Sequence, residues 1–206
     1  MLDLSSGSAT TFFKMPKTGS SSVELLLEGT GVSVVQHESP VAARQALKAA
    51  EWSFCFVRNP FWRLVSAWNW VVHAPTTVNE HHRQAQEEIR KLGEFDAFVA
   101  HLDTVSRGPY GIHFLPMSGW ICEDGELLVQ RLCRYEDFEQ ELRDLWRERD
   151  LEPVDFGRLR RRVFLGVTDQ SEYAQFYDSE ALLDRVTAFY AEDFSRFAYP
   201  QRLPAD

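Results

Sequence analysis

A stretch near the start of the chain combines residue types that bind phosphate. Residues 11–22 read TFFKMPKTGSSS, a short apolar run followed by a turn and the start of a helix-type pattern. Lys17 supplies a point charge, and the hydroxyls of Thr18 and Ser20–Ser22 supply donors. Gly19 allows a tight turn, and the first turn of the following helix adds unpaired N–H groups and the positive end of its dipole. The stretch therefore predicts an anion site of the kind that holds a nucleotide.

This arrangement differs from the Walker A loop, in which a Gly is followed by four residues and then by Gly-Lys-Ser/Thr. Here Lys17 precedes the single Gly19. The order Pro-Lys-Thr-Gly-Ser-Ser instead resembles the 5′-phosphosulfate loop of sulfotransferases that use 3′-phosphoadenosine 5′-phosphosulfate (PAPS). For this segment alone, a capped strand–helix turn with an exposed Lys is the structural alternative.

A second segment adds a further phosphate ligand. Residues 52–57 (WSFCFV) are a continuous apolar run, typical of a strand buried on both faces of a parallel sheet. Arg58 follows the strand, Pro60 suits the first turn of a helix, and Ser66 lies further along that helix. We expect Arg58 and Ser66 to converge on a second phosphate. Taken alone, Arg58 is equally typical of a salt-bridged strand end.

The second segment also resembles the sulfotransferases, because Val-Arg-Asn-Pro followed by Arg and Leu-Val-Ser is similar to their 3′-phosphate-binding strand and helix. Residues 134–138 (RYEDF) and 190–194 (YAEDF) extend the likeness. The chain resembles carbohydrate sulfotransferases of the heparan 2-O and chondroitin type, in a soluble, bacterial-like form. Residues 74–120 match weakly, and we expect them to form a variable acceptor-side region.

The resemblance implies a PAPS-dependent O-sulfotransferase that releases PAP. In that reaction Lys17 would stabilise the leaving phosphate, because charge moves onto it as the sulfuryl group is transferred in line. A metal is not required by this chemistry, and the adjacent His81 and His82 lack metal-ligand spacing. The residues implied in donor binding are Lys17, Thr18, Gly19, Ser20, Ser21, Ser22, Arg58 and Ser66.

A general base must remove the proton of the acceptor hydroxyl, and His is suited because its free pKa lies near neutrality. His37 is the predicted base, since it follows the predicted strand 32–36 at the sheet edge where doubly wound sheets bind ligands. It precedes Arg58 by 21 positions (58 − 37). In the heparan-type 2-O-sulfotransferases that the chain resembles, the base is a His a little over twenty residues before the corresponding Arg. Glu38 is the alternative base.

These residues need an alternating α/β framework to position them, and the hydrophobic pattern predicts one. Strands are expected at 12–15, 32–36, 53–57, 126–134 and 163–167. Helices are expected at 20–29, 40–50, 60–72, 76–92, 95–101, 135–149 and 180–194. The alternation predicts one domain over residues 1–206, with a central parallel sheet flanked by helices, like a P-loop kinase. Residues 104–120 are expected to form a long aromatic loop.

Composition and charge narrow the expected partners and the expected cellular location of the protein. The chain has 22 Lys and Arg against 31 Asp and Glu, a net charge of −9, which argues against nucleic acid as a partner. Three cysteines without a Cys-x-x-Cys pair favour a reducing compartment. The sequence has neither a signal-peptide pattern nor an apolar run long enough to span a membrane, so we expect a cytoplasmic protein.

Several questions stay open at this point. The acceptor is expected to be a carbohydrate or small-molecule hydroxyl, and the aromatic residues at 68, 70, 110, 114 and 120 suit a sugar ring, an aryl group or a lipid equally well. His73 and His113 are further residues suited to an acceptor pocket, and residues 164–168 or Trp62 to the adenine. A P-loop-type kinase or other phosphotransferase is one alternative function. An inactive module that binds PAP or PAPS is another, and the oligomeric state is not predicted.

Overall fold

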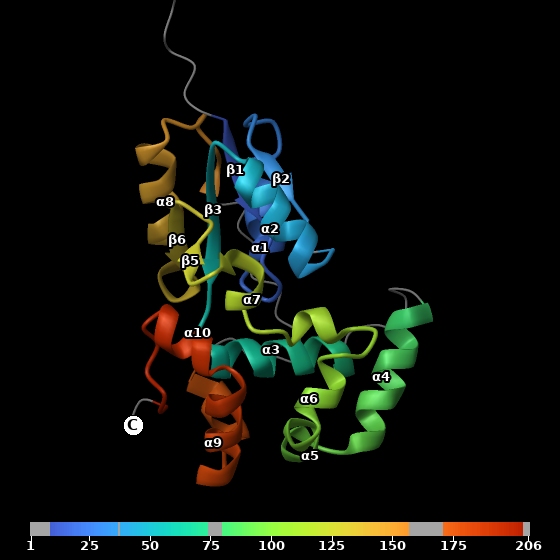
Figure 1. The fold of residues 1–206 in the computed structure, drawn as a ribbon. Helices are drawn as coiled ribbons and strands as arrows, with labels where there is room; N and C mark the ends of the chain where they lie inside the picture. Colours follow the sequence, from blue (N-terminus) through green and yellow to red (C-terminus); the bar gives the residue numbers. More distant parts are fainter. Residues whose placement is uncertain (1–8, 37, 74–79, 157–170, 204–206) are drawn as a thin grey trace, which may run out of the picture. The chain divides into compact units, whose positions relative to one another are not determined.

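The computed structural model describes residues 9–36, 38–73, 80–156 and 171–203. Its contacts divide the chain into two compact units. Residues 1–58 and 117–161 form the first, which holds the parallel sheet and is called the sheet unit below. Residues 59–116 and 162–206 form the second, the helical unit, whose described elements are all helical (Figure 1).

The sheet unit contains four parallel strands in the order β2-β1-β3-β6. The strands are β1 (Thr10–Phe13), β2 (Ser33–Val35), β3 (Trp52–Val57) and β6 (Arg131–Arg134). A separate hairpin pairs β4 (Cys122–Glu123) with β5 (Glu126–Leu127). The helical elements of this unit are α1 (Ser20–Leu27), α2 (Pro40–Ala49), α7 (Ser118–Ile121), η2 (Tyr135–Asp137) and α8 (Phe138–Glu148).

Helices cover both faces of this sheet, which explains why β1 and β3 are buried at almost every position. One face presents Phe12, Phe54 and Cys133 to a core that is completed by α1 and α8. On the other face, the ring of Phe13 lies 6.0 Å from the ring of Trp120 in α7. The predicted α/β fold with a central parallel sheet flanked by helices is therefore confirmed.

Helix α2 begins at Pro40, where the sequence predicts a helix start. Pro40 occupies the first turn, and the Ser39 hydroxyl accepts a hydrogen bond of 3.2 Å from the Ala42 N–H. The chain after α1 turns through Gly29, whose φ of 82° suits a residue without a Cβ.

Two expected elements are interrupted. The predicted strand 126–134 is divided between β5 and β6, because β5 pairs antiparallel with β4 whereas β6 pairs parallel with β3. The predicted helix 180–194 breaks at Tyr190, which separates α9 from α10. The predicted strand 163–167 lies outside the described residues, and the single-domain organisation of residues 1–206 stays a prediction.

The helical unit packs around aromatic side chains from several segments. Phe61, Phe95 and Phe194 are buried there, and the hydroxyl of Tyr177 donates a hydrogen bond of 2.8 Å to the Phe61 carbonyl. The described elements of the helical unit are α3 (Pro60–His73), α4 (Glu80–Leu92), α5 (Phe95–Ala100), α6 (Leu102–Val105), η1 (Gly111–His113), η4 (Ser171–Phe176), α9 (Glu180–Phe189) and α10 (Ala191–Arg196).

Segment 104–120 was expected to form a loop. It instead takes part in three short helices, α6 and η1 in the helical unit and α7 in the sheet unit.

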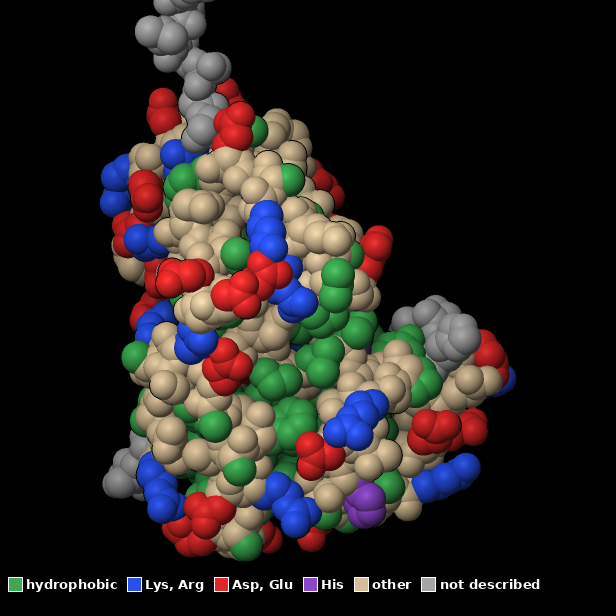
Figure 2. All heavy atoms as spheres, viewed as in Figure 1, with side chains coloured by type: hydrophobic (Ala, Val, Ile, Leu, Met, Phe, Trp, Pro, Cys, Tyr) green, Lys and Arg blue, Asp and Glu red, His purple; other side chains and the backbone are tan. Residues whose placement is uncertain are grey.

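The described helices are all too short or too polar to cross a membrane. On the face of the sheet unit seen in Figure 2, acidic and basic side chains are interspersed. Charges of both signs on this face differ from a continuous basic patch, the pattern typical of a nucleic-acid-binding surface.

Candidate active site

The loop between β1 and α1 has the backbone geometry of an anion site. Lys17 has a φ of 68° and Gly19 a φ of 75°, so two residues in a span of three adopt the left-handed conformation. Left-handed residues alternating with right-handed ones turn successive N–H groups toward one point. Gly19 also caps α1 without a side-chain hydrogen bond, and the first turn of that helix carries no acidic residue. The helix N-terminus is therefore suited to an external anion.

Gly19 is required at its position by its neighbours as well as by its φ. A Cβ at this residue would lie 2.7 Å from Cε2 of Tyr135 and 3.0 Å from Cε2 of Phe138. Both distances are shorter than van der Waals contact. The aromatic rings that follow β6 thus pack directly against the loop that follows β1.

Arg58 joins the same cluster from the end of β3. It is 4% exposed, its Nη1 donates to the Lys17 carbonyl at 3.4 Å, and its guanidinium lies 4.3 Å from the centre of the Tyr135 ring. The carboxyl ends of β1, β3 and β6 therefore bring Lys17, Arg58 and Tyr135 together. Strand order reverses between β1 and β3, and the crevice at such a reversal is where open α/β sheets bind ligands.

The hydroxyl groups of the loop are not equivalent. Thr18 is fully buried, and its hydroxyl donates a 3.1 Å hydrogen bond to the Met15 carbonyl. In this structure that hydroxyl supports the fold of the loop. Ser20 is buried, Ser21 is exposed and Ser22 is half-buried.

A carboxylate in α1 connects the loop to the neighbouring strand end. Glu24 forms an ion pair with Lys14 through one oxygen and accepts a 2.8 Å hydrogen bond from Nε2 of Gln36 through the other. Gln36 directly follows β2 and precedes His37. His37, the predicted base, lies outside the described residues, and Glu38, the alternative, is exposed.

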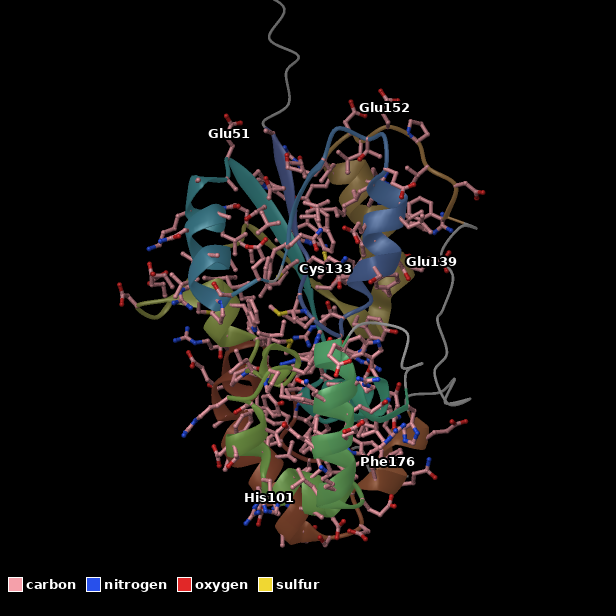
Figure 3. The ribbon with its side chains drawn as sticks, turned by 90° about the vertical axis from the view of Figure 1, so that its right-hand side faces the viewer. Glu51, His101, Cys133, Glu139, Glu152 and Phe176 are labelled. Carbon is pink, nitrogen blue, oxygen red and sulfur yellow. The ribbon has the colours of Figure 1, made fainter. Side chains whose placement is uncertain are left out.

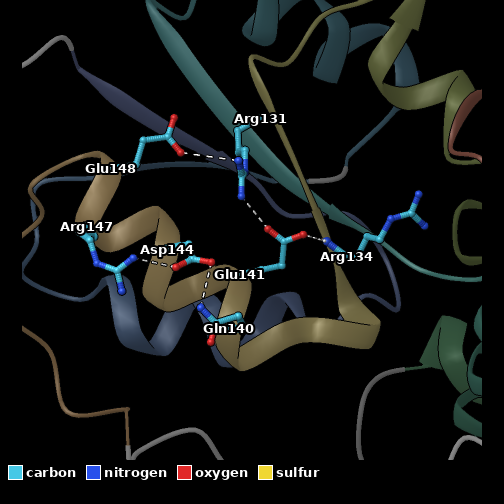
Figure 4. A network of polar contacts seen from close by, with 7 residues as sticks. All are labelled: Arg131, Arg134, Gln140, Glu141, Asp144, Arg147 and Glu148. Atoms are coloured by element: carbon cyan, nitrogen blue, oxygen red, sulfur yellow. Dashed lines mark hydrogen bonds and ion pairs between the residues drawn. The ribbon is translucent and has the colours of Figure 1, made fainter.

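A second polar network holds the end of β6 against α8 (Figure 4). Glu141 accepts a 3.0 Å hydrogen bond from the Arg134 N–H and forms a 2.8 Å ion pair with Arg131. This fixes the backbone that leads directly into Tyr135. Cys133, labelled in Figure 3, is buried between strand and helices. Burial, reinforced by the charge of Glu141, raises the pKa of its thiol to about 12, so it stays protonated at neutral pH.

Ser66 lies on α3 in the helical unit, where it is half-buried, whereas Arg58 belongs to the sheet unit. Their predicted convergence on one phosphate stays a prediction. Arg63, which is 1% exposed, serves the fold: its Nη1 donates to the His113 carbonyl at 3.2 Å and its Nη2 to the Leu115 carbonyl. Trp62 is 6% exposed, and residues 164–168 lie outside the described residues.

The sequence reasoning missed Tyr135 and Glu24 as parts of this site. Tyr135 belongs to the RYEDF segment that resembles the sulfotransferases, and its position directly after a strand was the available signal. Glu24 had a weaker signal, because a single acidic residue in an apolar helix start is typical of many surface helices.

A comparison with family models matches residues 14–200 to the sulfotransferase family. The chain belongs to the sulfotransferase family. The matched region begins at Lys14, so it contains the whole loop after β1 as well as Arg58 and Tyr135. Comparisons with curated proteins and with solved structures gave no match. The resemblance to the family drawn from the sequence is thus confirmed, and the assignment to the heparan 2-O and chondroitin type stays a prediction.

Proposed function

We propose that this sulfotransferase takes its sulfuryl group from PAPS and transfers it to a hydroxyl oxygen. The observation that carries the proposal is the cluster at the β1/β3 strand reversal. There a loop with two left-handed residues, Lys17 and Gly19, lies against the buried cation Arg58. A family member with two cationic side chains at one sheet edge is suited to a donor with phosphate groups at two positions.

In the proposed reaction the acceptor oxygen forms a bond to sulfur, the bond from sulfur to the 5′-phosphate oxygen breaks, and PAP leaves. Negative charge develops on that phosphate. Lys17 and the N–H groups of the loop would meet this charge with donors that are already oriented, so little reorganisation accompanies the reaction. The left-handed φ of Lys17 has an energetic cost, which is common where backbone is held for function.

His37 is the proposed base, and it would take the proton that the acceptor hydroxyl loses. The residue before it, Gln36, is held by Glu24, which also pairs with Lys14 at the start of the loop. This network supports a fixed spacing between the base segment and the donor loop. Glu38 remains the alternative base.

Arg58 is proposed to hold the 3′-phosphate together with Ser66. The Tyr135 ring lies against the guanidinium of Arg58, and such stacking restricts the side chain before a ligand arrives. An Arg held in this way loses less conformational entropy on binding than a solvated one.

The test is transfer of labelled sulfur from PAPS to a panel of hydroxyl acceptors. Wild type should transfer label, Lys17→Ala and His37→Ala should lose it by about a hundredfold or more, and Glu38→Gln should keep it. Lys48→Ala is the matched control, because Lys48 is exposed and pairs with Glu123 on the surface of the sheet unit.

Loss of activity in Glu38→Gln with retention in His37→Ala would reassign the base. Phosphate transfer from ATP without sulfur transfer from PAPS would favour the kinase alternative. Tight PAP binding without transfer to any acceptor would favour the inactive binding module.

A further inference from the structure

Tyr135 and Arg58 leave the sheet side by side, although they are far apart in the sequence. Strands β3 and β6 are parallel, and their register pairs Val57 with Arg134. Arg58 directly follows Val57, and Tyr135 directly follows Arg134. The two side chains therefore meet at the carboxyl edge of the sheet, where the guanidinium of Arg58 lies 4.3 Å from the centre of the Tyr135 ring. Both residues belong to the sheet unit, so the contact lies within one compact unit.

The Tyr135 ring is itself held in place by its neighbours. Its Cε2 packs on the loop after β1, where an added Cβ on Gly19 would lie only 2.7 Å away. Its ring centre lies 5.5 Å from that of Phe138 at the start of α8. The Glu141 carboxylate accepts a hydrogen bond from the N–H of Arg134, the residue directly before the tyrosine. The half-buried ring thus presents a surface of fixed orientation to its neighbours.

Arg58 is held on two sides by this surface and by the loop. Its Nη1 donates to the Lys17 carbonyl at 3.4 Å, while the Tyr135 ring lies against the guanidinium. A guanidinium is planar, and its N–H groups lie in that plane. A ring against the cation and a carbonyl at its edge together fix the plane, and the ring does so without using any N–H group. The side chain is only 4% exposed, which strengthens its contact with the ring.

We propose that Tyr135 is a positioning residue that sets the preference of the donor site for a nucleotide with a 3′-phosphate. The inference rests on the proposed function, in which Arg58 binds that phosphate. A bidentate contact with phosphate requires a guanidinium plane that faces two oxygens, so an Arg oriented beforehand binds more tightly than one that must first be ordered. Tyr135 acts through Arg58. Loss of the ring therefore reduces recognition of the 3′-phosphate and leaves recognition of the rest of the nucleotide unchanged.

Calorimetric titration with PAP and with AMP, which lacks the 3′-phosphate, tests the inference in Tyr135→Leu. Leucine keeps an apolar side chain beside Gly19 but removes the aromatic face. The affinity for PAP should fall by about tenfold, as the loss of a desolvated cation–π contact gives, and the affinity for AMP should change by less than about twofold. Tyr135→Phe keeps the ring and should bind both nucleotides like wild type.

Trp52→Leu is the matched control, because it removes a similar contact at the other end of β3. The guanidinium of Arg149 lies 4.4 Å from the centre of the Trp52 ring, and Trp52 is the first residue of that strand. This variant should keep the wild-type preference for PAP over AMP. Thermal melts establish which variants are folded, and Tyr135→Met takes the place of Tyr135→Leu if leucine prevents folding.

A double-mutant cycle with Arg58→Ala separates positioning from packing. In the Arg58→Ala background, replacing Tyr135 by Leu should leave the affinity for PAP unchanged, because the guanidinium that the ring orients is absent. An equal loss of PAP affinity with and without Arg58 overturns the inference.

The remaining outcomes are equally decisive. An undiminished preference for PAP in folded Tyr135→Leu overturns the inference, and so does an equal loss of PAP and AMP affinity, because the ring would then act on the nucleotide or the loop directly. A loss in Tyr135→Phe as large as in Tyr135→Leu also overturns it, since the hydroxyl would then be the active group. Wild type that binds PAP no more tightly than AMP instead refutes the role of Arg58 in the proposed function itself.

Discussion

Replacing Gly19 by Ala tests whether the loop after β1 is held in its shape by the ring that follows β6. The new Cβ would lie 2.7 Å from Tyr135 Cε2, and the residue would keep a φ near 75°. The left-handed conformation costs an L-residue about 1–2 kcal/mol. Overpacking against the two rings adds about 1–3 kcal/mol. We therefore expect the free energy of unfolding of Gly19→Ala to fall by about 2–5 kcal/mol.

Gly29→Ala is the matched control for this substitution. Gly29 has a φ of 82°, and a Cβ there would meet nothing within 4 Å. It should therefore lose only the conformational part, about 1–2 kcal/mol. Urea denaturation followed by tryptophan fluorescence measures both, and the difference between them isolates the contact with Tyr135 and Phe138.

Ligand binding gives the second readout. Gly19→Ala should weaken PAP binding by at least tenfold because the loop must shift, whereas Gly29→Ala should bind PAP like wild type. In a Tyr135→Ala background the stability cost of Gly19→Ala should shrink, since the closest clash is gone. Equal stability costs for Gly19→Ala and Gly29→Ala, with equal PAP affinities, would refute the reasoning.

Other substitutions separate fold from function. Arg63→Ala should lower the free energy of unfolding by about 2–4 kcal/mol, because the buried carbonyl of His113 and the partly buried carbonyl of Leu115 lose their donor. Ser66→Ala should change the free energy of unfolding by less than about 0.5 kcal/mol and weaken PAP binding. Urea melts measure the stabilities, and calorimetry measures the PAP affinity. The Cys133 thiol has its pKa raised from 9.0 to about 12, so the unfolded chain releases this proton first as the pH rises. Stability should then fall above about pH 9 by about 1.4 kcal/mol per pH unit for this group, and Cys133→Ala should reduce that slope in urea melts from pH 8 to 11. An unchanged slope would show that the thiol ionises alike in both states.

Local sequence patterns were sufficient to predict the main strands and helices in the first 58 residues of the sheet unit. The apolar run of residues 52–57 and the alternation of strand and helix patterns follow directly from burial on both faces of a sheet. The Ser39–Pro40 cap and the turn through Gly29 depend on neighbours in the chain, which local patterns capture well.

Contacts between distant segments were beyond the sequence. Tyr135 contacts Gly19 because β6 and β1 lie on either side of β3. Local sequence patterns do not determine this strand order. The hydroxyl of Thr18 turns inward to the Met15 carbonyl, a detail set by the loop fold. The helix after residue 180 breaks at Tyr190, whose hydroxyl donates a 2.6 Å hydrogen bond to the carbonyl of Phe114, far away in the chain.

The central claim is that Arg58 recognises the 3′-phosphate of a nucleotide whose 5′-phosphate lies in the loop of Lys17. Calorimetric titration of wild type, Arg58→Ala and Lys17→Ala with PAP and with AMP, which lacks the 3′-phosphate, tests it most directly. We expect wild type to prefer PAP over AMP by about a hundredfold, as the loss of a charge-assisted bidentate contact would give. Arg58→Ala should bind both nucleotides alike, and Lys17→Ala should weaken both by a similar factor. Equal affinity of wild type for PAP and AMP, or an undiminished preference for PAP in Arg58→Ala, would contradict the account.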